Sequence, residues 1–366
     1  NPVFLINLAG KKIFTDAAVD SNILFLEKEK YISSTKALVI NQGSFNPSHI
    51  DKEIAETYAF NDEPWIIAPK KVLNILNLMK TTSVTLKDLP IEIYNGIKTG
   101  LNDAFYIDEI TKSRLVDEDP KSAELISPFF RGRDIKPYTA LHSLWMINTH
   151  NGIKAKGIQK VQIESYPAIK KHLDFWYPEL EKRYDKGDSP YHLRNCAYLQ
   201  EFYKAKIIYP NMTSKFPFLF DESGILINQK CFFIVAKDDS FPLRALLGIL
   251  NSRYCKTWIH YNCPDLGSGG REISKVYFEN FPLPDILSPK LSHLFTKLEL
   301  ELCLRLSHEK AIDTQRKRLI QQLKENFDFF TSPDNLERFW ELDYKNFIKI
   351  LKKQKVILSH KEHYLW

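Results

Sequence analysis

Three short segments of the sequence combine cations with glycines, which suits the binding of a polyanion. Residues 94–105 are YNGIKTGLNDAF, residues 129–138 are FFRGRDIKPY, and residues 267–271 are GSGGR. Glycines let backbone N–H groups approach a ligand closely, and Arg, Lys, Thr and Asn supply donors for phosphates and base edges. Each segment alone also fits an ordinary surface turn, and in the second segment Asp134 could pair with a neighbouring arginine. Together the three segments favour a nucleic-acid-binding surface.

Catalytic patterns are weak in comparison. A methyltransferase that acts on an exocyclic amine needs an Asn/Asp/Ser-Pro-Pro-aromatic loop, whose polar atoms accept hydrogen bonds from the amine while the aromatic ring stacks on the flipped base. Residues 188–191 (DSPY) have one proline instead of two, so we interpret them as a turn, and residues 1–4 (NPVF) are a similar decoy. No Gly-rich loop follows an early strand, so no cofactor cradle is visible. We therefore predict no catalytic residue in this chain.

Candidate metal ligands are incomplete. The acidic residues in 117–119 and 334–337 lack the paired arrangement that a metal-dependent phosphodiesterase requires. Cys255, His260 and Cys263 offer three ligands for zinc without a fourth, so we interpret these cysteines as buried thiols and predict no metal. The total of five cysteines is odd and includes no Cys-x-x-Cys, which favours reduced thiols over a disulfide framework.

Composition sets wider limits. The length of 366 residues suggests two structural units. The residues are 44% hydrophobic and 13% aromatic, which is ample for a packed core. The net charge of +6 permits a polyanionic partner but does not require one. No apolar run approaches the roughly 20 residues of a membrane helix. The N-terminus has no basic region typical of a signal peptide, so we expect a cytoplasmic protein without membrane contact.

Hydrophobic periodicity predicts the elements that position the three segments. Strands are predicted at 12–16, 23–27, 206–209 and 231–236, with strand-like stretches on both sides of the turn in 91–107 and short strands continuing to about residue 150. Helices are predicted at 52–58, 70–79, 166–184, 243–251 and 291–327. We expect the helix at 166–184 to begin just inside Pro167 and to be kinked or split at Pro178, because proline suits a first helical turn but not a helix interior.

The order of these blocks resembles the TaqI-like C-terminal specificity domain of bacterial type IIG restriction–modification enzymes. The resemblance covers about residues 60–285, and its blocks are 96–105, 131–138, 166–173, 180–187, 193–194, 206–210, 247–252 and 270–284. It implies that a larger parent protein methylates adenine N6 with S-adenosylmethionine, with Mg²⁺ needed if a nuclease is present. It implies that this chain contributes the part that selects the site on double-stranded DNA, without a cofactor of its own.

The resemblance also implies a domain plan of class α+β. Residues 1–30 are expected to be terminal strands of a truncated methyltransferase domain, an interpretation that fits a chain beginning at Asn1. Residues 31–65 are expected to be a linker, residues 66–288 a mixed-sheet DNA target-recognition domain, and residues 289–366 a helical C-terminal region. The expected partners are duplex DNA and the missing N-terminal methyltransferase domain.

Motif position and side-chain chemistry select the candidate contacts to DNA. We predict as DNA-binding residues Lys98, Thr99, Asn102, Arg131, Arg133, Lys136, Tyr138, Arg183, Lys186, Ser268, Arg271 and Lys275. Arg133 and Asn102 are assigned to base edges, since arginine can fork onto guanine and an amide can pair with adenine. The phosphate contacts are assigned to Lys98, Lys136, Arg183 and Lys186.

Two alternatives remain open from the sequence. The chain could be a scaffold whose helix at 291–327 binds a partner subunit, with no DNA specificity of its own; a helix-mediated dimer without DNA affinity would favour it. It could also be a divergent, intact methyltransferase in which residues 188–191 are catalytic; stoichiometric binding of S-adenosylmethionine would favour that.

Overall fold

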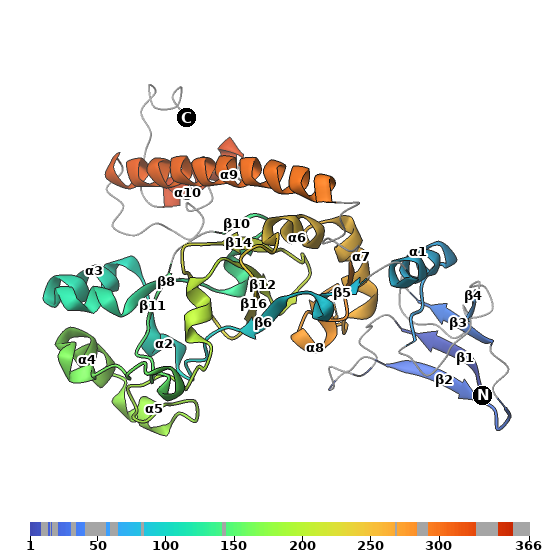
Figure 1. Cartoon of the computed structure of the whole chain (residues 1–366), viewed down its shortest axis with the longest axis horizontal. Helices are drawn as coiled ribbons and strands as arrows, with labels where there is room; N and C mark the ends of the chain where they lie inside the picture. The colour runs from blue at the N-terminus through green and yellow to red at the C-terminus, as the bar shows by residue number, and fades with distance from the viewer. Residues whose placement is uncertain are drawn as a thin grey trace. The chain divides into compact units, whose positions relative to one another are not determined.

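The computed structural model describes the chain in twelve stretches, and Figure 1 draws its helices and strands. The described residues are 1–8, 14, 16, 21–30, 34–40, 56–58, 65–81, 84–140, 144–267, 269–283, 292–326 and 343–353. The chain divides into two compact units, Asn1–Leu302 and Cys303–Trp366. Helices accompany several small sheets, two of which mix parallel and antiparallel pairs, so the α+β class is confirmed.

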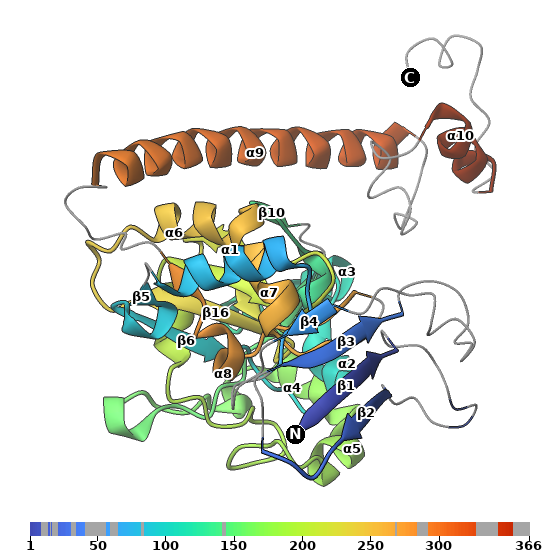
Figure 2. The same cartoon turned by 90° about the vertical axis from the view of Figure 1, so that its right-hand side faces the viewer.

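A four-stranded sheet forms the start of the first unit (Figure 2). Its order is β2-β1-β3-β4, with β1 parallel to β3 and the other two pairs antiparallel. The strands are β1 (Pro2–Asn7), β2 (Asn22–Leu26), β3 (Thr35–Val39) and β4 (Glu56–Tyr58). The strand predicted at 23–27 is confirmed. The strand predicted at 12–16 falls on residues of which the structure describes only Phe14 and Asp16.

The segment expected to be a linker contains two of these strands. The helix predicted at 52–58 is wrong at its described residues, because Glu56–Tyr58 pairs with β3 as a strand. In β3, Thr35, Ala37 and Leu38 are buried while Lys36 is exposed, so the strand contributes to a core. The polar character of the surrounding residues hid this short apolar stretch from the sequence analysis.

The antiparallel sheet at the centre of the chain consists of β14 (Leu219–Asp221), β12 (Lys206–Pro210), β16 (Cys231–Ala236) and β6 (Ile91–Asn95), in that order. The strands predicted at 206–209 and 231–236 are confirmed. Both are continuous apolar runs because they are the two inner strands, which are covered on both faces. The fully buried Tyr209 packs against Phe218 and Phe278, whose rings also stack on each other.

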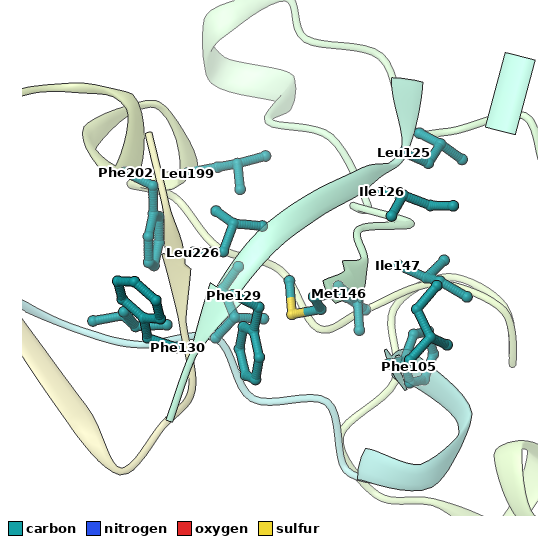
Figure 3. Packing of buried hydrophobic residues seen from close by; sticks show 14 of the residues in the cluster. Phe105, Leu125, Ile126, Phe129, Phe130, Met146, Ile147, Leu199, Phe202 and Leu226 are labelled. Carbon is teal, nitrogen blue, oxygen red and sulfur yellow. The ribbon is translucent and has the colours of Figure 1, made fainter. Parts of the chain in front are cut away.

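A second mixed sheet shares its hydrophobic core with the central sheet. Its order is β15 (Leu226–Ile227), β8 (Ile126–Phe130), β11 (Leu144–Ile147) and β7 (Tyr106–Ile107). Figure 3 shows Phe129, Met146 and Leu226 from this sheet in one hydrophobic cluster with Phe202. Phe233 of β16 belongs to the same cluster, and its ring centroid lies 4.5 Å from that of Phe202. The shared core fixes the ends of β6, β8 and β15 relative to one another.

The helices of the first unit surround these sheets. They are α1 (Lys70–Thr81), α2 (Asn102–Phe105), α3 (Glu109–Glu118), α4 (Pro167–Asp174), α5 (Tyr177–Lys182), α6 (Leu243–Leu250), α7 (Arg253–Asn262) and α8 (Lys275–Phe278). The helices predicted at 70–79 and 243–251 are confirmed. The start at Pro167 and the break near Pro178 are also confirmed. Hydrophobic periodicity did not predict α3, because Leu115 is its one buried side chain and so narrow an apolar stripe gives little periodic signal.

Short elements complete the first unit. Three two-stranded pairs join β9 (Ile135–Lys136) to β10 (Thr139–Ala140), β13 (Met212–Thr213) to β17 (Arg271–Glu272), and β5 (Val84–Thr85) to β18 (Pro282–Leu283). The 3₁₀ helices are η2 (Leu86–Asp88), η3 (Pro120–Glu124), η4 (Gly132–Asp134), η5 (Lys154–Lys156), η6 (Ile163–Ser165) and η7 (Leu199–Tyr203).

Two helices follow β18 in the described part of the chain. They are α9 (Ser292–Asn326), which confirms the helix predicted at 291–327, and α10 (Tyr344–Lys353), which buries Phe347 and Leu351. Among the described helices, none combines the length and the apolar composition needed to cross a membrane.

Candidate nucleic-acid interface

The first predicted segment, 94–105, lies against the turn that joins β15 to β16, residues 228–231, which we call the central turn. The N–H of Ile97 donates to the carbonyl of Ile227 at 2.8 Å, and the N–H of Gln229 donates to the carbonyl of Ile97 at 3.0 Å. Gly96 lies where the two backbones cross. A Cβ at this position would be 2.0 Å from the carbonyl oxygen of Asn228, so this approach requires glycine.

The second predicted segment, 129–138, contacts the same turn from the end of β8. The N–H of Asn228 donates to the carbonyl of Phe130 at 3.3 Å. A Cβ on Gly132 would lie 3.2 Å from Cβ of Pro210 and 3.5 Å from the carbonyl oxygen of Lys230, so a small residue suits this position.

The third predicted segment, 267–271, is connected through Asn211, which follows β12. The N–H of Asn211 donates to the carbonyl of Lys230 at 2.7 Å, and its own carbonyl accepts from the N–H of Ile273 at 2.6 Å. Next to this link β13 pairs with β17, so that Thr213 is opposite Arg271. A continuous chain of backbone hydrogen bonds thus joins all three segments through the central turn.

The central turn was missed by the sequence analysis. It is closed by a hydrogen bond from the N–H of Cys231 to the carbonyl of Asn228 at 2.9 Å, and Oδ1 of Asn228 accepts from the N–H of Lys230 at 3.3 Å. Gln229 and Lys230 are exposed, and their side chains have no partner within the described part of the chain. An Asn-Gln-Lys stretch between the apolar runs ILI and CFFIVA was a usable turn signal.

The arginines of segment 129–138 differ in their freedom. Arg131 makes two parallel bonds to Asp134, from Nε to Oδ2 at 2.9 Å and from Nη2 to Oδ1 at 3.0 Å, and its N–H also donates to Oδ2 at 2.8 Å. The pairing that the sequence left open for Asp134 is therefore present. Arg133 is exposed and has no partner among the described residues. Lys136 and Tyr138 are half-buried, and the N–H of Tyr138 donates to the carbonyl of Phe218.

Arg183, predicted as a phosphate contact, lies inside the protein. Its guanidinium donates to the carbonyls of Thr99, Pro190 and His192, the bond to Pro190 being 2.9 Å long, and it lies 4.7 Å from the centre of the Phe105 ring. Burial lowers the pKa of Arg183 to about 10, so it remains charged at neutral pH. Because Nη1 and Nη2 donate to these carbonyls and the side chain is buried, the structure does not support the predicted phosphate contact and gives Arg183 a positioning role.

Asp185 connects this buried arginine region to the surface. Its carboxylate lies 2.8 Å from Nζ of Lys98 and 3.2 Å from Nη1 of Arg194. Lys98 is 44% exposed, so its ammonium reaches solvent while one side is neutralised. Lys186 is exposed, and its Nζ donates to the carbonyl of Glu181 at 2.5 Å.

Thr99 and Asn102 form a pair at the start of α2. Thr99 is 1% exposed, and its hydroxyl donates to Oδ1 of Asn102 at 2.8 Å. The predicted DNA contact of Thr99 therefore does not agree with the structure, since its polar atom is already used internally. Asn102 is exposed.

Arg271, predicted as the cationic tip of a flexible loop, is also held internally. It is 6% exposed; its Nη1 lies 2.7 Å from Asp265, and its Nε donates to the carbonyl of His260 at 2.8 Å. The structure thus makes Arg271 an anchor of the loop, which corrects its prediction as a free cation. Lys275 is 45% exposed and lies 3.8 Å from Glu92. Ser268 lies outside the described residues.

The possible catalytic and metal-binding motifs of the sequence have structural roles in the fold. Residues 188–191 form bends and a turn, and Asp188 accepts from Asn151 and Lys160. Cys255 and Cys263 are buried, and burial raises the pKa of Cys263 to about 12. Within the described residues, no group of three or more His, Cys, Asp or Glu side chains is arranged to hold a metal ion.

Comparisons with known proteins give one family match and one curated relative. Residues 127–283 match the family model of the TaqI-like C-terminal specificity domain. The chain is 24% identical, over 234 residues, to the type II methyltransferase M.BanIII of Aneurinibacillus aneurinilyticus, an alignment covering 61% of this chain and 40% of that protein. The chain spans less than half the length of this curated relative.

Solved structures of two restriction–modification enzymes were also matched, and the first of them is similar to this chain in fold. The type IIL restriction–modification enzyme MmeI, solved in complex with DNA, is similar over 96% of this chain and 42% of its own, with a TM-score of 0.51 and 12% identity. The type IIG restriction endonuclease BpuSI matches 82% of this chain and 38% of its own, with a TM-score of 0.43 and 12% identity.

Proposed function

We propose that this chain, whose residues 127–283 match the model of the TaqI-like specificity domain, is the sequence-reading part of a bacterial type IIG restriction–modification enzyme and binds duplex DNA. The observation that supports this most is the chain of backbone hydrogen bonds through the central turn. It connects three segments rich in donors, which are far apart in the sequence, to one turn.

The exposed side chains of this surface divide into two proposed roles. Arg133 reads a base edge, because a guanidinium without an internal partner is free to fork onto O6 and N7 of guanine. Asn102 is the second base-edge candidate. The exposed ammonium groups of Lys98, Lys186 and Lys275 contact phosphates, which positions the protein without reading sequence.

A second set of residues holds the surface in place. Arg131 and Arg271 fix segments 129–138 and 267–271 through Asp134 and Asp265. Arg183 fixes segment 94–105 through the carbonyl of Thr99. We assign no direct DNA contact to these buried or paired groups. Lys136 and Tyr138 remain candidates for contact at the edge of segment 129–138.

The proposal places methyl transfer outside this chain. The parent protein would be a cytoplasmic, S-adenosylmethionine-dependent adenine-N6 methyltransferase, with Mg²⁺ required where a nuclease is fused to it. The preceding methyltransferase domain and duplex DNA are the proposed partners. Within the domain plan, residues 66–288 form the recognition domain and residues 289–366 a helical region.

An equilibrium binding assay with duplex DNA at several salt concentrations tests the proposal. The variant Arg133→Ala should bind the preferred duplex about 1–3 kcal/mol more weakly and should accept more bases at one position. Arg253→Ala is the matched control: Arg253 is likewise exposed and unpartnered in the described part of the chain, but it begins α7 and takes no part in the hydrogen bonds that join the segments. If the wild-type chain binds no duplex at low salt, the proposal is wrong and the scaffold alternative gains support.

A further inference from the structure

Hydrogen bonds to two of the predicted segments and to Asn211 hold the backbone of the central turn. The N–H groups of Asn228 and Gln229 donate to the carbonyls of Phe130 and Ile97, and the carbonyl of Lys230 accepts from Asn211. Each predicted segment therefore has a hydrogen-bonded connection to this turn. A shift of the turn would break bonds to several segments at once, so its side chains extend from a rigid platform.

The two middle residues of the turn carry its free side chains. Asn228 is 8% exposed, and its Oδ1 is used within the turn. Gln229 and Lys230 are exposed and unpartnered among the described residues. The neighbouring segment 129–138 presents the exposed Arg133, and a Cβ on Gly132, the residue before it, would lie 3.5 Å from the carbonyl oxygen of Lys230. The turn thus places a residue with a carboxamide and a residue with an ammonium next to the segment that carries Arg133.

The chemistry of the two side chains separates their roles. A carboxamide presents a donor and an acceptor side by side, which matches N7 and the N6 amino group of adenine in the major groove. An ammonium is a donor that suits a phosphate oxygen, and such a contact carries no sequence information. A fixed backbone matters for the carboxamide, because a bidentate contact requires both of its atoms to meet the base edge together.

We propose that Gln229 is a specificity-determining residue that reads one adenine of the recognised duplex, and that Lys230 contacts a backbone phosphate next to it. This assignment rests on the proposed function. It adds the central turn, which connects the three predicted segments, as a fourth reading element.

The isosteric variant Gln229→Glu gives a distinctive expectation. It keeps the shape of the side chain but replaces the amide donor with a second acceptor, and a carboxylate accepts from the N4 amino group of cytosine. The preference at a single position should therefore change from adenine to cytosine by about ten-fold or more, with the other positions unchanged. Because Gln229 is exposed, the substitution should leave the fold intact.

The experiment is selection of bound duplexes from a randomised pool by the full chain and its variants. The control Gln159→Glu introduces the same change at another exposed glutamine, one outside the network of the central turn, and should leave the selected motif unchanged. Lys230→Ala should weaken binding to all duplexes alike and reduce the slope of log affinity against log salt by about one.

The outcomes distinguish this assignment from the proposed function. If the wild-type chain selects a motif and Gln229→Glu selects the same motif, the assignment of Gln229 is wrong and the proposed function stands. If Lys230→Ala changes a base preference, the two roles are wrongly divided. If the wild-type chain selects no motif, the proposed function fails and the assignment fails with it.

Discussion

Replacing Arg183 with methionine tests whether this arginine, which the sequence predicts to contact phosphate, instead holds the fold through internal hydrogen bonds. The side chain of Arg183 donates to the carbonyls of Thr99, Pro190 and His192 and packs over Phe105. Methionine is similar in length and retains an apolar contact with the ring, but it cannot donate to any of the three carbonyls. The substitution therefore isolates the hydrogen bonds.

The expected loss of stability follows from the number of orphaned acceptors. A buried hydrogen bond contributes about 1 kcal/mol net, so three lost bonds cost about 3 kcal/mol. Removing a charge that burial disfavours offsets part of this cost, and burial does lower the pKa of Arg183. We expect the free energy of unfolding to fall by about 2–3 kcal/mol, which corresponds to a decrease in Tm of roughly 3–5 °C in a unit of this size.

Urea unfolding and DNA binding together decide the role of Arg183. The matched control is Arg194→Met, because Arg194 is 58% exposed and makes one ion pair to Asp185; it should lose less than about 1 kcal/mol. If Arg183→Met unfolds at the wild-type urea concentration while its salt slope for DNA binding falls by about one, the guanidinium contacts phosphate and the positioning role is refuted.

Two further substitutions test the packing that holds the surface. Gly96→Ala should destabilise the chain by about 1–3 kcal/mol and weaken DNA binding, because its Cβ would meet the Asn228 carbonyl at 2.0 Å. The control is Gly157→Ala, which strains a backbone with a φ of +70° but places no atom within 4 Å of the new Cβ. If both variants lose the same affinity for DNA, the clash at Gly96 is not the cause. Asp221→Asn should lower the free energy of unfolding at neutral pH by about 3–5 kcal/mol, because it leaves the buried ammonium of Lys206 without its counter-charge. Urea unfolding measures this change, and an unchanged midpoint would contradict the prediction. Burial raises the pKa of Asp221, but the ammonium of Lys206 and the hydrogen bonds from Ser223 outweigh burial and lower this pKa below 3.8. The ion pair therefore stabilises the fold above about pH 4, and this stabilisation is lost as the pH falls through the lowered pKa. The Asp221→Asn variant should not show this loss of stability in acid.

Local patterns in the sequence were sufficient for much of the fold. The apolar runs at 206–210 and 231–236 and the proline-marked helices near Pro167 and Pro178 were predictable because their signals lie within a few residues. The strand β3 and the helix α3 were not, since the first is embedded in polar residues and the second buries little apolar surface.

The candidate site was also predictable from the sequence only in part. Composition selected three segments that the structure connects, but it could not distinguish free cations from internal ones. Arg183 is 84 residues away from its acceptor Thr99, and Arg271 is anchored partly by His260, 11 residues earlier. The central turn was missed because its importance depends on backbone hydrogen bonds to Ile97, Phe130 and Asn211, which no local pattern reveals.

The most direct test of the central claim is selection of duplexes from a randomised pool by the wild-type chain at two salt concentrations. The proposed function predicts that one short motif is recovered and that affinity falls as salt rises, because base contacts supply specificity while phosphate contacts supply salt dependence. The absence of an enriched motif at either salt concentration would contradict the claim that this surface reads DNA sequence.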